Sequence, residues 1–275
     1  MGISITLLGT GSPLPSATCA GPSTLVRAGG TPLLVDAGRG VVMRLAGAGL
    51  MPLQLSAVLL THLHSDHITD LNDVITTHWV MTDQATELPI HGPPGTQAVV
   101  DGILEMLTLD QGYRCAHHED LDYPPGAVVT EVEPGDTLTI GGATVSVHAT
   151  DHRPVTPTVG YRITHEGAVA ALAGDTVPCA GLDEMTAGAG AYVQTVVRDD
   201  LINLVPRQRL QDIVDYHSTV VQAAQTAAKA GVGTLVLTHM VPEVPEGGED
   251  QWRAIAAEHF DGDIVVGRDL TTVEV

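Results

Sequence analysis

One short segment constrains this chain more than any other: Thr61-His62-Leu63-His64-Ser65-Asp66-His67. It places three imidazoles and one carboxylate within six positions, a density of polar side chains that serves core packing poorly. The segment directly follows the apolar run Val58–Leu60, which is typical of a buried strand. Alternate strand residues share a face, and a tight turn brings the others round. Because imidazole nitrogen and carboxylate oxygen are zinc ligands, the segment predicts a metal site at a strand end.

The remaining pattern predicts an α/β chain, and 275 residues with 44% hydrophobic content can bury a large core in one domain spanning 1–275. Apolar runs between Gly/Pro turns predict strands at Ile3–Leu8, Ser23–Arg27, Thr31–Asp36, Ala57–Thr61, Val128–Val132, Thr137–Ile140, Thr144–Ala149, Thr158–Ile163, Ala168–Ala173 and Thr234–Leu237. Helices are predicted between Gly40 and Gly49, over 70–86, at Thr96–Thr108 and at Val220–Lys229. Residues 109–126 indicate an excursion that could act as a lid.

The charge balance bears on partners. Twelve Lys+Arg against 33 Asp+Glu give a net charge of −21, which repels a polyanion, so nucleic acid is not the partner we expect. The start of the chain is typical of a strand rather than a secretory signal, and no apolar run reaches membrane-spanning length. Three cysteines at unrelated spacings, Cys19, Cys115 and Cys179, favour a reduced cytoplasmic protein.

Several segments together resemble the metallo-β-lactamase superfamily, in its ribonuclease Z and arylsulfatase-like branch. The matching segments are Leu8-Gly9-Thr10-Gly11-Ser12-Pro13, Leu34-Val35-Asp36-Ala37-Gly38, the histidine-rich run at 61–67, Asp151-His152-Arg153, Gly160-Tyr161-Arg162-Ile163, Gly174-Asp175-Thr176 and Leu237-Thr238-His239. The resemblance covers nearly the whole chain. It implies a four-layer αββα sandwich, and the branch commonly forms homodimers.

Carried over position by position, the resemblance implies two Zn²⁺ ions, with Mn²⁺ or Fe²⁺ as alternatives. It assigns His62, His64 and His152 to the first ion and Asp66, His67 and His239 to the second, with Asp175 bridging them. Asp66 and His217 are the predicted catalytic residues, since His217 in Tyr216-His217-Ser218-Thr219 resembles the histidine that helps to protonate the leaving group. Asp36 is predicted to orient a ligand histidine from behind.

Some of these assignments have alternatives. His148 competes with His152 but lies within a predicted strand, so we favour His152 on its Asp-His-Arg context. Asp175 could cap a turn, and His239 could be a polar residue at a strand end. Ser218 or Thr219 could simply cap the helix that follows. The remaining histidines, His78, His91, His117 and His118, are expected in solvated loops.

Two departures argue against tRNA as the substrate. The tRNA-processing enzymes carry an inserted arm that grips tRNA, whereas only residues 164–173 separate Ile163 from Gly174 here. They also tend to place a His-Glu pair after the bridging aspartate, where this chain has Gln194-Thr195. His217 thus loses the acidic partner that would orient it.

We therefore predict a dinuclear zinc hydrolase that uses a metal-bridging hydroxide to cleave a small ester, a phosphodiester or an aryl sulfate in the first place, or else a carboxylic ester or lactone. One alternative is a ribonuclease Z-type tRNA 3′-processing endonuclease, which would require Arg27, Arg39, Arg44, Arg153 and Arg162 to gather beside the metals. A β-lactamase matches the motif order less well. A non-catalytic binding protein on the same fold is the other alternative.

Overall fold

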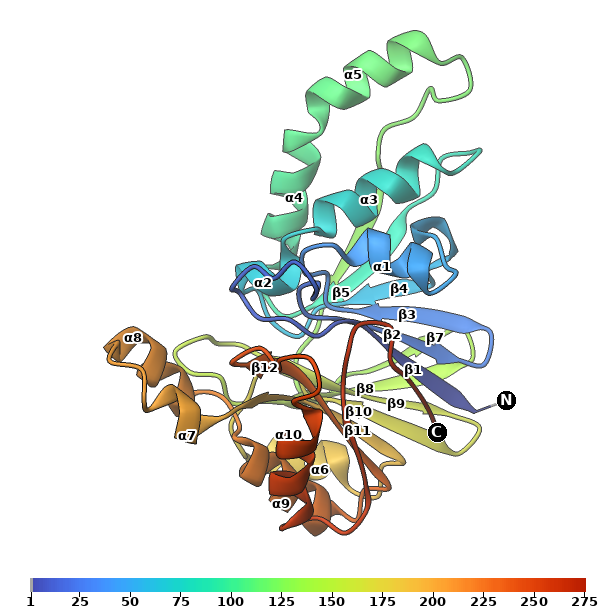
Figure 1. Ribbon diagram of the computed structural model, residues 1–275. Coiled ribbons are helices and arrows are strands. Elements are labelled where there is room, and N and C mark those ends of the chain that lie inside the picture. Colours follow the sequence, from blue (N-terminus) through green and yellow to red (C-terminus); the bar gives the residue numbers. More distant parts are fainter. Residues whose placement is uncertain (1) are drawn as a thin grey trace.

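Two seven-stranded sheets face each other at the centre of the protein (Figure 1). The computed structural model describes residues 2–275. The first sheet runs in the order β14 (Thr272–Glu274), β1 (Ile3–Gly9), β2 (Ser23–Ala28), β3 (Thr31–Val35), β4 (Ala57–Leu59), β5 (Leu88–Gly92) and β6 (Ala127–Glu131). The second runs in the order β13 (Asp263–Val266), β12 (Thr234–Val241), β11 (Ala191–Val197), β10 (Ala168–Leu172), β9 (Val159–His165), β8 (Ala143–Ala149) and β7 (Thr137–Ile140).

The alternation of side chains along each strand builds two hydrophobic layers per sheet. On β3, Leu33 and Val35 pack into the core between the sheets, whereas Leu34 faces the helices outside. On β12, Val236 faces the inner core and Leu235 the outer layer. Strands covered on both faces are apolar almost throughout, which is why they stand out in the sequence as continuous hydrophobic runs.

Helices cover the outer face of each sheet, completing a four-layer αββα sandwich as predicted (Figure 1). The first sheet is covered by α1 (Val41–Gly47), α3 (Leu71–Val80) and α4 (Thr96–Met106). The second is covered by α6 (Ala180–Thr186), α9 (Val220–Ala230) and α10 (Glu249–Ala257). The short elements are η1 (Pro52–Gln54), α2 (Ser65–Ile68), α7 (Asp199–Ile202), α8 (Gln208–Gln211) and η2 (Asp212–Asp215). None of the helices within 2–275 combines the length and apolar character needed to span a membrane.

The structure confirms the predicted strands and helices to within a few residues, except that the helix predicted over 70–86 ends at Val80. It also adds elements that the pattern did not reveal. The largest omission is β11, a fully buried strand that pairs in parallel with β10 and β12. Its sequence contains Tyr192, Gln194 and Thr195, and the polar residues broke the apolar run. Residues 109–126 begin as a helix, α5 (Thr108–His117), which has no buried residue and extends away from the sandwich (Figure 1).

Parallel pairing brings several strand ends to one edge of the sandwich. β3 pairs in parallel with β4, and their carboxyl ends lead to Asp36 and to the run that starts at Thr61. In the other sheet β10, β11 and β12 are parallel, and β10 and β12 end near Asp175 and His239. Chemistry on α/β folds is commonly built at such carboxyl ends, since loops there diverge from a rigid scaffold.

One hydrogen bond ties the two sheets together beside this edge. Tyr161 on β9 is fully buried, and its hydroxyl donates to the carbonyl oxygen of Leu60 at 2.7 Å. Leu60 immediately precedes Thr61 and His62, so the bond fixes the start of the histidine-rich run.

We expect Tyr161→Phe to lower the free energy of unfolding by about 1–3 kcal/mol, because it leaves the buried Leu60 carbonyl without this donor. Urea denaturation measures the change. Tyr113→Phe is the matched control, since Tyr113 is 71% exposed on α5 and should stay within about 0.5 kcal/mol of the parent. Equal stabilities for the two variants would contradict the role given to Tyr161.

Candidate metal centre

All seven predicted ligand residues converge at the edge where the strand ends meet. They form two groups in which the ligand atoms lie within 4.8 Å of one another. One group contains His62, His64, His152 and Asp175, and the other contains Asp66, His67 and His239. Each group combines residues from the first sheet's side with residues from the second, so only the folded sandwich assembles them.

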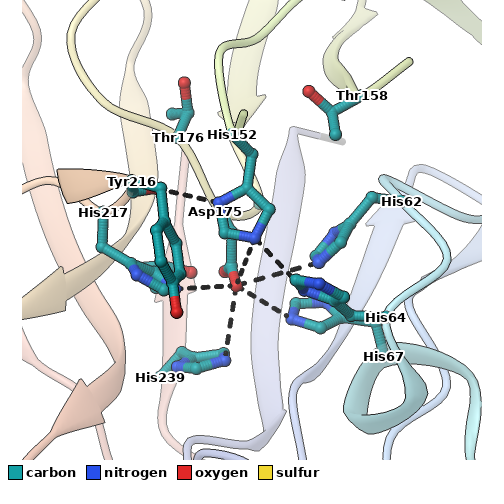
Figure 2. Close-up of polar contacts among 12 residues, drawn as sticks. His62, His64, His67, His152, Thr158, Asp175, Thr176, Tyr216, His217 and His239 are labelled. Carbon is teal, nitrogen blue, oxygen red and sulfur yellow. Dashed lines mark hydrogen bonds and ion pairs between the residues drawn. The ribbon is translucent and has the colours of Figure 1, made fainter. Parts of the chain in front are cut away.

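The carboxylate of Asp175 lies between the two groups (Figure 2). Its Oδ2 atom is 3.8 Å from His62 Nε2 and 3.9 Å from His152 Nε2 on one side. On the other side it is 3.4 Å from His67 Nε2 and 3.7 Å from His239 Nε2. One oxygen atom that faces both groups at similar distances is the arrangement that a bridging ligand requires.

Unpaired buried atoms test whether this site suits a cation. The Nε2 atoms of His62 and His67 and the Oδ1 atom of Asp175 are buried and have no hydrogen-bond partner within residues 2–275. Leaving buried polar atoms unpaired costs about 1–3 kcal/mol each, and native proteins rarely tolerate several together. Because these atoms all belong to the two groups, a divalent cation at each group fits the donor set.

Asp36 holds two of the histidines in place. Its Oδ2 atom accepts a hydrogen bond from His67 Nδ1 at 2.8 Å and another from the Thr61 hydroxyl at 2.9 Å. The Thr61 hydroxyl in turn lies 3.1 Å from His62 Nδ1. With their Nδ1 atoms engaged in this way, His62 and His67 both present Nε2 to the cluster. Neighbouring groups of this kind fix the tautomer and direction of ligand histidines.

The backbone is strained at two of these positions. Asp36 has a φ of 61° and His239 a φ of 46°, in the left-handed region that few non-glycine residues adopt, although Asn, Asp and His do so more often than others. Such strain costs on the order of 1–3 kcal/mol and persists where the surroundings over-determine it. Here it turns both side chains into the cluster at the ends of their strands.

Main-chain carbonyls of the segment before α9 orient the remaining histidines. His152 Nδ1 lies 2.8 Å from the Tyr216 carbonyl oxygen, and His217 Nδ1 lies 2.8 Å from the Ile213 carbonyl oxygen. His217 Nε2 therefore faces Asp175 Oδ2, at 3.2 Å (Figure 2). The sequence did not reveal either carbonyl, because a backbone partner leaves no signal in residue type.

Burial and the carboxylates set the protonation of the cluster. Burial holds the pKa of His62 well below its usual value and lowers the pKa of His152 to about 4, so both are neutral at pH 7. Burial opposes ionisation of Asp175, but His239 and His67 outweigh it and hold the pKa of Asp175 well below its usual value. His67 and His239 differ: burial opposes their protonation, but Asp175 outweighs it and raises the pKa of both. Because metal binds neutral imidazole and ionised carboxylate, these two histidines would release a proton when a metal binds.

Known proteins match most of the length of this chain. Residues 31–240 match the family model described as the beta-lactamase superfamily domain. Ribonuclease Z of Mycolicibacterium gilvum is 58% identical over 99% of this chain and 96% of its own length. Ribonuclease Z of Mycobacterium avium is 57% identical over 99% of this chain and 98% of its own length. This chain belongs to the metallo-β-lactamase superfamily, in its ribonuclease Z branch.

Solved structures show the same fold at lower identity. The metallo-β-lactamase fold protein YhfI of Bacillus subtilis has a TM-score of 0.77 and 23% identity, with 100% of both chains covered. The short form of human tRNase Z has a TM-score of 0.72 and 21% identity, with 98% of both chains covered. Membership of the ribonuclease Z branch makes this protein a metal-dependent hydrolase of ester bonds, and the cluster of histidines and aspartates supports a divalent metal site.

Within the ribonuclease Z branch, this chain keeps the departures seen in its sequence. β9 and β10 form a tight hairpin, with His165 paired to Ala168, so no arm is inserted there. Gln194 is held by Tyr192 and by the Gly174 carbonyl oxygen rather than by His217. His217 has the Ile213 carbonyl in place of an acidic partner.

Three of the five arginines that a nuclease was expected to gather beside the metals are held by other partners. Arg27 donates to the Ala48 carbonyl, Arg44 pairs with Asp269 at 2.8 Å, and Arg162 donates to the carbonyls of Met185 and Ala187. Arg153 is exposed beside His152 but is paired with Asp151. The relatives named ribonuclease Z favour a nuclease nonetheless, so this requirement was too strict.

Other histidines stay outside the cluster. His148 lies on β8, where its Nε2 is 3.2 Å from the Ser146 hydroxyl, and it belongs to neither ligand group. The expectation of solvated loops was wrong for His78, which is buried on α3, and for His91, which lies on β5. His117 and His118 are exposed at the end of α5.

We expect Asp36→Asn to weaken zinc affinity by about 10- to 100-fold. One carboxylate oxygen becomes an NH2 group that cannot accept, so either the Thr61 N–H bond to Oδ1 or the His67 and Thr61 hydroxyl bonds to Oδ2 are lost. Competition against a chromophoric chelator measures the affinity, and circular dichroism checks the fold. Asp101→Asn is the matched control, because Asp101 is exposed on α4 away from the cluster. Unchanged affinity in Asp36→Asn would show that Asp36 has no part in metal binding.

Proposed function

We propose that this protein is a zinc-dependent endonuclease of the ribonuclease Z type that processes the 3′ end of precursor tRNA. The observation that carries this proposal is full-length identity of 56–58% to relatives named ribonuclease Z. A small ester or aryl sulfate substrate finds no support among these relatives. The expectation that nucleic acid is not a partner rested on the charge of −21, on the missing arm and on Gln194-Thr195 in place of a His-Glu pair, and the relatives do not support it.

The ligand groups fit two zinc ions. His62, His64 and His152 would hold one, Asp66, His67 and His239 the other, and Asp175 would contact both. Bound zinc would supply a water-derived nucleophile at neutral pH and offset the negative charge of a phosphodiester. Manganese or iron would suit the same histidine and carboxylate donors.

Two side chains have roles beyond ligation. Asp66 Oδ2 lies 3.2 Å from His239 Nε2, within the second ligand group. We assign its carboxylate the further role of orienting the nucleophile. His217 is nearly buried, and the Ile213 carbonyl fixes its imidazole so that Nε2 faces the centre of the site. A histidine held in this way can give a proton to the leaving oxygen of a phosphodiester, which is typical general acid chemistry.

An acidic protein can still bind RNA. Many phosphate contacts in nucleic-acid complexes come from hydroxyls, amides and backbone N–H groups rather than from a basic cluster. Association should be slower and more dependent on shape than for a basic nuclease.

We further propose that residues 1–275 act as one hydrolase domain, that the excursion at 109–126 serves as a lid, and that the protein is a cytoplasmic homodimer.

The test is cleavage of a precursor tRNA with a 3′ extension by zinc-loaded protein, with the cut site mapped. We expect a single cut at the 3′ end of the tRNA body, and a rate lower by roughly 10²- to 10³-fold in Asp66→Ala. Asp101→Ala, an exposed acid on α4, should keep the parent rate.

Bis-p-nitrophenyl phosphate, p-nitrophenyl sulfate and a lactone serve as competing substrates in the same assay. Turnover of the sulfate or the lactone without tRNA cleavage would reject the nuclease in favour of a small-ester hydrolase. Metal-loaded protein that turns over none of these substrates would favour a binding protein on this fold.

A further inference from the structure

The side chain of Tyr216, as well as its backbone, contacts residues of the site. Its ring lies beside two site histidines, with centroid distances of 5.1 Å to His152 and 4.7 Å to His217. Its carbonyl oxygen accepts from His152 Nδ1 at 2.8 Å. Ring packing therefore positions the side chain, and the hydrogen bond from His152 positions the backbone of the same residue.

The hydroxyl of Tyr216 has no partner. No hydrogen bond joins it to any other atom of residues 2–275, and it is not among the buried unpaired atoms, so it stays open to a molecule that enters the site. Figure 2 shows the phenol running alongside the His217 imidazole, with its oxygen on the same side as the ligand cluster. A substrate beside His217 would meet this oxygen.

The other half-buried or buried tyrosines contrast with it. The hydroxyl of Tyr161 donates to the Leu60 carbonyl, that of Tyr192 donates to Gln194, and that of Tyr123 donates to the Thr82 carbonyl. Buried phenols normally find such partners. Tyr216 differs from these three because its side chain is only half-buried, so its hydroxyl is open to solvent and to a molecule bound beside His217.

The chemistry of a phenol makes this hydroxyl a donor. Its ordinary pKa of about 10 leaves it protonated at neutral pH. A neutral donor suits an anionic phosphate better than a phenolate would, since it adds no negative charge to a site that already holds carboxylates.

We propose that Tyr216 is a further catalytic residue, whose hydroxyl donates a hydrogen bond to a non-bridging oxygen of the scissile phosphodiester bound beside His217. The proposal rests on the proposed phosphodiester chemistry of this site. The bond strengthens as negative charge grows on the phosphate oxygens, so it lowers the barrier more than it tightens substrate binding. No proton leaves Tyr216 in this role.

Tyr216→Phe tests the proposal, because it removes the hydroxyl and keeps the ring that packs on His152 and His217. We expect kcat to fall by about 10- to 100-fold on both precursor tRNA and bis-p-nitrophenyl phosphate, as for a lost hydrogen bond to a charged group. KM should stay within about twofold and the zinc content should not change. Thr139→Val, which removes an exposed hydroxyl on β7 outside both ligand groups, is the control and should match the parent.

Each outcome separates the alternatives. An unchanged kcat on both substrates would overturn the role of the hydroxyl, and so would a fall in kcat that follows from lost zinc. A lower kcat on bis-p-nitrophenyl phosphate in a protein that never cuts tRNA would keep Tyr216 as catalytic and reject the proposed tRNA substrate.

Discussion

The buried carboxylate of Asp175 is the constraint around which the site is built. An ionised group cannot remain in a protein interior without compensation, and here Asp175 is 3% exposed with four ligand histidines and His217 aimed at one of its oxygens. The histidines alone do not fully offset the charge of the Asp175 carboxylate, because the Nε2 atoms of His62 and His67 stay unpaired. Two cations would satisfy the carboxylate and the imidazoles together, which explains why the ligands form two groups that share it.

The sandwich makes this convergence possible. Asp175 and His239 come from the second sheet and the 61–67 run comes from the first, so neither half holds a metal site alone. Two hydrogen-bonded groups connect the sheets to the ligands. Asp36 accepts from His67 and Thr61. The Tyr161 hydroxyl of the second sheet donates to the Leu60 carbonyl, next to the histidine-rich run. The geometry of the centre therefore depends on the registry of the two sheets.

Much of this was predictable from sequence, because dense ligand motifs and apolar strand runs are local signals. The 61–67 run predicted the metal site, the apolar runs predicted an α/β chain, and the family resemblance implied the αββα sandwich. Long-range effects left no such trace. The polar residues Gln194 and Thr195 mask the burial of β11 in the sequence, and the Gln194 amide is hydrogen-bonded inside the protein. The backbone carbonyls of Ile213 and Tyr216 orient His217 and His152, and a backbone carbonyl would do so whichever side chain stood at positions 213 and 216. Net charge reports the whole surface rather than the site, and the small-ester substrate that it favoured has no support among the relatives.

Anomalous diffraction at the zinc edge, on crystals of the zinc-loaded protein, tests the central claim most directly. The account predicts two zinc peaks per chain, one at His62, His64 and His152 and one at Asp66, His67 and His239, with Asp175 in contact with both. A single peak, or zinc bound without Asp175, would contradict it.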